Sequence, residues 1–232
     1  MNKVILNGIT VTIFNGMDDL LGFVNAGKSL LIAVNAEKII NRAPEIKEII
    51  NTNIGYLDGI GPVLAARRKG FSEARKIPGC ELWLKLVDRF CLTRSFYLLG
   101  STGQVVEETA RKLQKEFPGI SIVGYHDGYL RTDTLKSEVI DDIVRKKPDV
   151  VFVAMGSPRQ ELLMNELYKL HPALYMGLGG SFDIYTGRVK RAPKWWVNHN
   201  LEFAYRLLMQ PKRLKRQIHL WRFLWLLVTN RL

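Results

Sequence analysis

The sequence predicts an α/β fold with a parallel-sheet core and a helical, basic appendage at its carboxyl end. Short β-branched runs alternate with amphipathic helical windows over roughly the first 185 residues, which is typical of a parallel sheet with crossover helices. After Pro193 the pattern is helical and contains no further strand candidates. The positive charge is concentrated in that last part. We therefore expect a Rossmann-like core over residues 1–193 and an appendage over residues 194–232.

Eight segments are expected to form strands. They are short, rich in β-branched and other apolar residues, and separated by turn residues or helical windows. The expected strands are residues 4–6, 10–13, 30–34, 54–57, 95–99, 120–125, 150–154 and 174–177.

Seven helices are expected between these strands. Pro44, Pro62 and Pro158 suit the first turn of a helix, where a missing amide hydrogen costs nothing. Pro211 is expected to begin a second helix of the appendage. The expected core helices are residues 18–26, 44–51, 62–68, 81–90, 105–117, 135–146 and 158–170.

The composition excludes several classes of protein. With 47% hydrophobic and 24% charged residues among 232, the chain has the balance of a globular protein and is neither disordered nor fibrous. The mean hydropathy of −0.03 and the lack of an apolar run of about 18–20 residues argue against a membrane span. We expect no signal peptide. Cys80 and Cys91 form no CxxC pair, which favours a reducing cytosol over a disulfide framework.

The charge of the chain is uneven. Of a net charge of +12, residues 188–232 carry +10, together with four of the five tryptophans. Clustered cations mixed with Trp, Phe and Leu favour contact with an anionic membrane surface. Two alternatives stay open: nucleic acid, disfavoured by the dense apolar residues at 223–228, and a helix that packs its apolar face on its own core.

Three glycine-rich loops follow expected strands. In an open parallel sheet, ligands bind beyond the carboxyl ends of strands, where glycines allow close approach of the backbone. Three such loops in register favour a nucleotide-type ligand, although neither GxGxxG nor GxxxxGK[ST] is present. The loops span residues 97–104, 152–161 and 177–183 and contain the candidates Gly100, Gly156, Ser157, Gly179, Gly180 and Asp183.

Several polar residues also follow expected strands. Asn35 and Glu37 end one apolar strand, and Asp58 ends another beside a glycine. Asp58 is either a turn residue or a base that takes a proton from a substrate hydroxyl. Gln160 and Glu161 open a helix, where capping is the alternative to ligand binding. The four histidines are scattered, so no metal site is expected, and no GxSxG or Cys-His pattern supports a covalent hydrolase.

Seven motifs occur in an order that resembles the WecG/TagA/CpsF glycosyltransferases, family 26. The resemblance covers nearly the whole chain, and its details are most similar to the WecG branch, whose members transfer N-acetyl-D-mannosaminuronate from UDP. The motifs are NAEK at 35–38, DGI at 58–60, GCELW at 79–83, DGY at 127–129, MGSPRQE at 155–161, GLGGSFD at 177–183 and TGRVKRAP at 186–193, followed by a similar tail at 205–216.

The resemblance implies inverting transfer from a UDP-sugar to GlcNAc-diphosphate-undecaprenol at the cytoplasmic face of the inner membrane. It implies that Asp58 is the general base and that Asn35 and Gln160 line its pocket. It also implies that Arg206, Arg213 and Arg216 bind the acceptor diphosphate. With no DxD motif, we expect no metal and no cofactor, and nucleic acid is not an expected partner.

The chain departs from the family pattern at two places. Lys76 stands where relatives often have arginine. Lys76 is therefore expected to bind the substrate as a point charge, without the bidentate hydrogen bonds that a guanidinium makes to a phosphate. Ala33 replaces a threonine found in some relatives, which argues against a hydroxyl role there. The alternatives are another UDP-hexose, for teichoic acid, capsule or O-antigen synthesis, or a non-catalytic protein that binds nucleotide sugars at the membrane.

Overall fold

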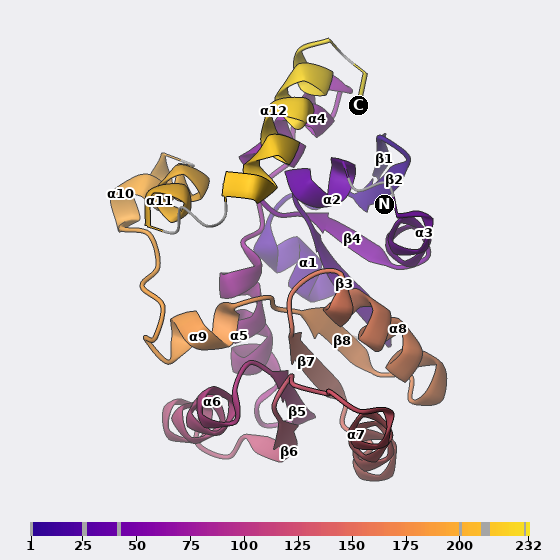
Figure 1. Ribbon diagram of the computed structural model, residues 1–232, viewed down its shortest axis with the longest axis vertical. Helices are drawn as coiled ribbons and strands as arrows, with labels where there is room; N and C mark the ends of the chain where they lie inside the picture. Colours follow the sequence, from indigo (N-terminus) through magenta and orange to yellow (C-terminus); the bar gives the residue numbers. More distant parts are fainter. Residues whose placement is uncertain (1, 25–26, 41–42, 200, 210–213, 230) are drawn as a thin grey trace. The chain divides into compact units, whose positions relative to one another are not determined.

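The computed structural model describes residues 2–24, 27–40, 43–199, 201–209, 214–229 and 231–232. This part of the chain has an α/β architecture: a Rossmann-like, six-stranded parallel sheet in the order β4-β3-β8-β7-β5-β6, flanked by helices, and a separate pair β1-β2 (Figure 1). The eight expected strands are confirmed, each to within one residue at either end. They are β1 Lys3–Leu6, β2 Ile9–Thr12, β3 Ser29–Val34, β4 Ile54–Leu57, β5 Ser95–Gly100, β6 Ser121–His126, β7 Val150–Ala154 and β8 Leu174–Gly177.

The seven expected helices are also confirmed, and several start earlier than expected. The helices α6 and α7 begin after Thr102 and Thr132, whose side chains accept hydrogen bonds from the amides of Val105 (3.3 Å) and Leu135 (3.2 Å). The helices are α1 Met17–Phe23, α2 Ala36–Ile40, α3 Pro44–Asn51, α4 Ile60–Arg68, α5 Gly79–Phe90, α6 Gly103–Glu116, α7 Asp133–Lys146, α8 Arg159–Leu170, α9 Ser181–Tyr185, α10 Lys194–Asn198, α11 Glu202–Met209 and α12 Leu214–Val228.

The prolines differ in their helical positions. Pro44 is the first residue of α3, as expected. Pro158 instead stands immediately before α8, and Pro62 is the third residue of α4. All three positions lie where an amide hydrogen has no partner within the helix, so the physical reason for the expectation still applies. Pro211 lies outside the described residues.

The chain divides into two compact units. Unit 1 comprises Met1–Gly16, Ala33–Pro78 and Lys190–Leu232, and unit 2 comprises Met17–Ile32 and Gly79–Val189. Because unit 1 combines the two ends of the chain with an internal segment, its core is made by residues far apart in sequence. The division expected after residue 193 stays a prediction.

Unit 2 is organised around parallel pairings of β3 with β8, β8 with β7, β7 with β5, and β5 with β6. The helices α5, α6 and α9 lie on one face of β7, β5 and β6, and α7 and α8 lie on the other (Figure 1). The buried Trp83 of α5 makes edge contacts with Phe152 of β7 (5.6 Å) and with Phe182 of α9 (5.7 Å). These contacts fix α9, and with it the loop after β8, on the sheet.

The edge strand β6 carries a bulge. Phe96 pairs with Ile122 and Tyr97 with Gly124, so Val123 is an extra residue in the ladder. A bulge on an edge strand disrupts the row of backbone groups that another strand would need for pairing. The described geometry therefore disfavours β6 as a docking edge.

Asp149 links the starts of β5 and β7. Its carboxylate accepts hydrogen bonds from the amide (2.8 Å) and hydroxyl (2.7 Å) of Ser95. Partial burial by itself raises the pKa of Asp149, but these bonds and the electrostatic influence of Arg94 and His171 outweigh it, so the pKa lies below its ordinary 3.8. A pKa lowered by folding stabilises the fold above the unfolded pKa, and this contribution is lost as the pH falls through the folded pKa.

We expect Asp149→Ala to lower the free energy of unfolding by about 1 kcal/mol at pH 7, because a hydrogen-bonded carboxylate is lost. The loss should shrink at acidic pH, below the ordinary pKa of 3.8, because the native carboxylate then takes up a proton as well. Urea unfolding at both pH values measures the difference. The exposed Asp141 on α7 provides the matched control, Asp141→Ala. An Asp149 effect that is equal at both pH values would contradict the prediction.

In unit 1, β1 and β2 form an antiparallel hairpin. The turn is Asn7-Gly8, with positive φ at both residues (50° and 78°), as a two-residue hairpin turn requires. The hairpin is held on α2 and α3: the Asn7 side chain donates to the Ile39 carbonyl of α2, and Lys47 and Asn51 of α3 donate to carbonyls of the turn. These two strands therefore do not belong to the parallel sheet.

The last helix of unit 1, α12, packs on α2 and α4. Phe223 and Leu227 are buried there, and the Arg68 guanidinium donates to the Leu227 carbonyl. A Cβ on Gly61 of α4 would lie 2.9 Å from the Phe223 ring, so the absence of a side chain at Gly61 leaves room for that ring. The inner face of α12 is thus part of a protein core, as one of the alternatives for the tail supposed.

Candidate active site

In unit 2 the loops after β5, β6 and β7 are joined through backbone contacts. Gly100 has a φ of 132°, and a Cβ there would lie 2.4 Å from the Ala154 carbonyl oxygen. Next to it, the Ser101 amide donates to that same oxygen (2.9 Å), and the Ser101 carbonyl accepts from the Gly128 amide (3.0 Å). Gly100 is therefore required for the packing of two strand ends.

The loops after β7 and β8 are joined by Gln160 of α8. Its Oε1 atom accepts from the amides of Gly156 (3.2 Å) and Gly179 (2.9 Å), and its Nε2 group donates to Glu161 (3.0 Å). Gln160 and Glu161 are 4% and 0% exposed. Four of the expected site residues, Gly156, Gln160, Glu161 and Gly179, thus form one connected group.

The loop after β8 is also joined to the loop after β5. The Ser101 hydroxyl donates to the Asp183 carboxylate (3.0 Å). Ser101 itself has a positive φ of 54°, a conformation that is uncommon outside glycine and often marks a functional loop. Sequence reasoning missed Ser101 and Gly128; their positions inside GSTG and DGY, each directly after a strand, were the available signal.

Two further expected residues of these loops stand at the surface. Ser157 is exposed, and so is Gly180, which begins α9 with an ordinary φ of −98°. A Cβ on Gly180 would meet no atom within 4 Å. The open space at Gly180 leaves room for a ligand to approach the backbone.

The helix α9 is anchored on α6. Lys112 donates to the Tyr185 carbonyl (2.7 Å), the Tyr185 hydroxyl donates to Glu116 (2.6 Å), and Arg188 pairs with Glu108 (3.1 Å). Burial, together with the bond to the Glu116 carboxylate, raises the pKa of Tyr185 well above its usual range. Tyr185 is therefore neutral and acts as a donor, which holds the loop before α9 in place.

Unit 1 places a second group of expected residues at the ends of β3 and β4. Asn35 follows β3 and caps α2, with its Oδ1 atom accepting from the Lys38 amide (2.9 Å). Glu37 is exposed in the first turn of α2. Lys38, which sequence reasoning did not single out, is buried and donates to the Ala33 carbonyl (2.7 Å). The NAEK motif therefore combines a cap with a buried ammonium group.

Asp58 stands directly after β4, and its amide donates to the Val34 carbonyl (3.0 Å), the last residue of β3. Asn35 and Asp58 thus stand directly after two neighbouring strands, β3 and β4. Gly59 has a φ of 101° and precedes α4, so the chain turns sharply after the Asp58 carboxylate. The loop of Lys76 is tied to the same place, because the Ile77 amide donates to the Leu57 carbonyl (2.9 Å).

The tail carries an exposed apolar stripe. On α12, exposed side chains recur at spacings of three and four residues, on the helix that also buries Phe223 and Leu227. Trp221 is 76% and Trp225 is 54% exposed, and Leu224 and Val228 continue the stripe. Of the arginines expected to bind diphosphate, Arg206 lies on α11 and Arg216 on α12. Their side chains, and the whole of Arg213, lie outside the described part of the chain.

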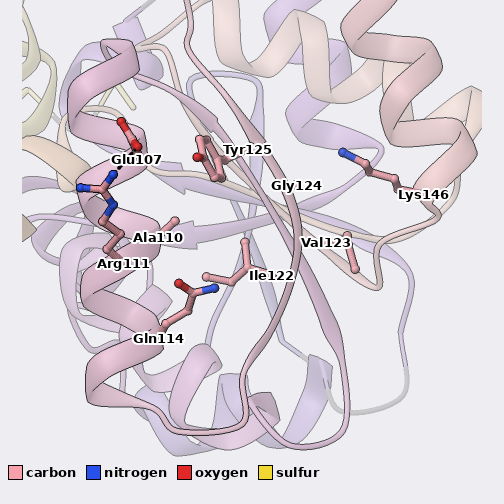
Figure 2. Close-up of a pocket in the computed structure, with 9 residues that line it drawn as sticks. All are labelled: Glu107, Ala110, Arg111, Gln114, Ile122, Val123, Gly124, Tyr125 and Lys146. Atoms are coloured by element: carbon pink, nitrogen blue, oxygen red, sulfur yellow. Dashed lines mark hydrogen bonds and ion pairs between the residues drawn. The ribbon is translucent and has the colours of Figure 1, made fainter.

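A hollow of about 500 Å³ lies beside β6, between strand and helix (Figure 2). Its wall includes Glu107 and Arg111 of α6, which pair with each other (2.6 Å), and Tyr125 of β6. None of the expected site residues lines it. We therefore assign the candidate site to the strand-end loops and not to this hollow.

Two observations concern metals and membranes. Among the residues that the structure describes, no three His, Cys, Asp or Glu side chains gather as metal ligands would. Within the same residues, no helix combines the length and the apolar character that crossing a bilayer requires.

A parallel α/β core with glycine loops and a carboxylate at its strand ends is typical of enzymes that act on nucleotide-activated substrates. The model of one such family, described as glycosyl transferase WecG/TagA/CpsF family, matches residues 6–232. The chain therefore belongs to the WecG/TagA/CpsF family of glycosyltransferases, which confirms the resemblance. It is a glycosyltransferase of surface polysaccharide synthesis.

Proposed function

We propose that this enzyme transfers N-acetyl-D-mannosaminuronate from its UDP-sugar to GlcNAc-diphosphate-undecaprenol, with inversion, at the cytoplasmic face of the inner membrane. The main support is the joined set of loops in unit 2. Gly156, Gln160 and Gly179 form one hydrogen-bonded group, and Ser101 and Asp183 form another. These loops follow three adjacent strands of a parallel sheet, the usual place for a nucleotide.

In the proposed reaction, a hydroxyl oxygen of the acceptor sugar forms a bond to the anomeric carbon of the donor. The bond from that carbon to the UDP oxygen breaks, and UDP leaves with the electron pair. The Asp58 carboxylate takes the hydroxyl proton as general base. Asn35, whose side-chain oxygen caps α2, keeps an amide group that can donate to the donor sugar. Lys76 and Glu37 complete the binding residues of unit 1.

The acceptor is lipid-linked in this proposal, so the enzyme must meet it at a membrane surface. The exposed stripe of Trp221, Leu224, Trp225 and Val228 and the basic tail suit that surface. Arg206, Arg213 and Arg216 are proposed to bind the acceptor diphosphate, which matches guanidinium geometry well. The enzyme needs no cofactor in this scheme.

The proposal is tested by measuring UDP release from purified enzyme with a GlcNAc-diphosphate-lipid acceptor and a panel of UDP-sugars. We expect UDP-N-acetyl-D-mannosaminuronate to give the highest kcat/KM. A higher value with UDP-N-acetylmannosamine or UDP-glucose would reassign the donor within the same family. No UDP release with any donor would remove the proposed reaction.

We expect Gly180→Val to weaken UDP binding by roughly 10-fold or more, because a branched side chain fills the open space where the ligand approaches the backbone. The φ of −98° and the lack of neighbouring atoms mean that the variant should fold normally. Titration calorimetry with UDP measures the change. Gly22→Val, at an equally open exposed glycine on α1, is the matched control. Unchanged affinity in folded Gly180→Val would place the donor elsewhere.

A further inference from the structure

Gln160 and Glu161 are polar side chains buried at the start of α8, at 4% and 0% exposure. Removing an amide and a carboxyl group from water is costly unless each finds hydrogen-bond partners. Their partners therefore indicate why they are buried there. Both residues were expected to bind substrate, but the described contacts of Gln160 are all with the protein itself.

The Gln160 amide is held in one orientation from both ends. Its oxygen faces two backbone N–H groups, those of Gly156 (3.2 Å) and Gly179 (2.9 Å), which only an acceptor can satisfy. Its NH2 group faces the Glu161 carboxylate (3.0 Å), which is an acceptor. Reversing the amide would set donor against donor and acceptor against acceptor, so the three contacts support one another.

The backbone around Gln160 completes the arrangement. The backbone N–H of Gln160 donates to the Gly156 carbonyl (3.1 Å), while the Gly156 N–H donates to the Gln160 side chain, so the two residues bond reciprocally. A Cβ on Gly177 at the end of β8 would lie 2.5 Å from the Gln160 Nε2 atom. The side chain therefore fills the space between two strand ends that β7 and β8 leave open for it.

We propose that Gln160 and Glu161 form a buried clasp: Gln160 ties the loops after β7 and β8 together, and Glu161 is the positioning residue that orients its amide. The clasp acts on the substrate through the two loops and not by direct contact. The effect on UDP binding rests on the proposed function, in which these loops hold the donor. The clasp itself is a property of the free protein.

The decisive variants exchange the two groups. In Gln160→Glu a second carboxylate faces Glu161, and we expect the Kd for UDP at pH 8 to rise by about 10- to 100-fold as the loops separate. The deficit relative to wild type should shrink as the pH is lowered from 8, because like-charge repulsion favours uptake of a proton by one carboxyl group of the pair. In the exchanged variant, Gln160→Glu with Glu161→Gln, the side chain at position 160 is a carboxylate that can accept from both loop amides, and the amide at position 161 can donate to it. Its affinity should return to within a few-fold of wild type.

Gln114→Glu, at an exposed glutamine of α6, is the matched control and should leave affinity unchanged. An exchanged variant that binds no better than Gln160→Glu, or a Gln160→Glu deficit that does not vary with pH, would overturn the clasp. Amide hydrogen exchange provides a readout that needs no ligand. We expect faster exchange at Gly156 and Gly179 in Gln160→Leu than in wild type, and unchanged rates there would also overturn the proposal. If wild type fails to bind UDP, the proposed function fails while the exchange experiment still decides the clasp.

Discussion

Asp58→Asn is expected to lower the turnover of the enzyme by about 10²–10⁴-fold while the affinity for UDP stays within a few-fold of wild type. Asparagine keeps the shape of the side chain but cannot take a proton from the acceptor hydroxyl. The backbone contacts that place residue 58, from its amide to Val34 and from the Ile77 amide to Leu57, do not involve the carboxylate. Steady-state kinetics and a UDP titration on the same preparation separate chemistry from binding.

The control for this substitution is Asp88→Asn at an exposed position on α5, which should leave both quantities unchanged. Turnover of Asp58→Asn within a few-fold of wild type would leave Asp58 as a turn residue next to Gly59. A parallel loss of UDP affinity would instead mean that the carboxylate holds the donor.

Trp221→Ser combined with Trp225→Ser is expected to weaken binding to anionic vesicles by about 100-fold. Each exposed indole that enters the interface contributes about 1–2 kcal/mol, and 1.4 kcal/mol corresponds to a factor of ten. Transfer to the undecaprenyl-linked acceptor in vesicles should fall in proportion, whereas transfer to a short-chain acceptor in water should not. Vesicle sedimentation and the two transfer assays measure these effects.

Both tryptophans are on the exposed side of α12, away from the buried Phe223 and Leu227, so the double variant should keep its fold. Leu92→Ser removes an equally exposed apolar side chain after α5 and serves as the control. If the double variant still binds vesicles like wild type, the stripe is not the membrane contact. If transfer to both acceptors falls equally, the tryptophans support the site and not the surface.

Most of the regular secondary structure could be predicted from the sequence, because burial of one face or of a whole strand imposes a pattern of apolar residues on the sequence. The continuous apolar run at Val150–Ala154 became a fully buried strand, and the amphipathic window after Thr102 became α6. The short helices α2 and α9, of five residues each, were missed because one turn is too short to show a period. The Asn7-Gly8 pair is a hairpin signal in the sequence. It was not used, because the alternation of strand runs with helical windows favoured a parallel sheet throughout the core.

For the candidate site, the sequence predicted separate positions but not the contacts between them. Strand-end glycines and carboxylates could be named, since the ends of parallel strands are where ligands bind. The sequence could not separate glycines needed for packing, such as Gly100 against Ala154, from glycines with open space, such as Gly180. It also could not reveal that Gln160 bonds to Gly179, because that contact joins two loops through the tertiary fold. Capping patterns near a helix start predict only local bonds.

The fit between Gly61 and the Phe223 ring bears on how this enzyme can be engineered and how its relatives can diverge. A tail exchanged between family members is not an independent module, because α12 needs a residue without a side chain on α4, three positions after Asp58. A donor tail with a smaller residue in place of Phe223 would leave a void, and in a host with a side chain at position 61 the Phe223 ring would have to shift. Chimeras that aim to change the membrane or acceptor preference should therefore move α4 and α12 as a pair.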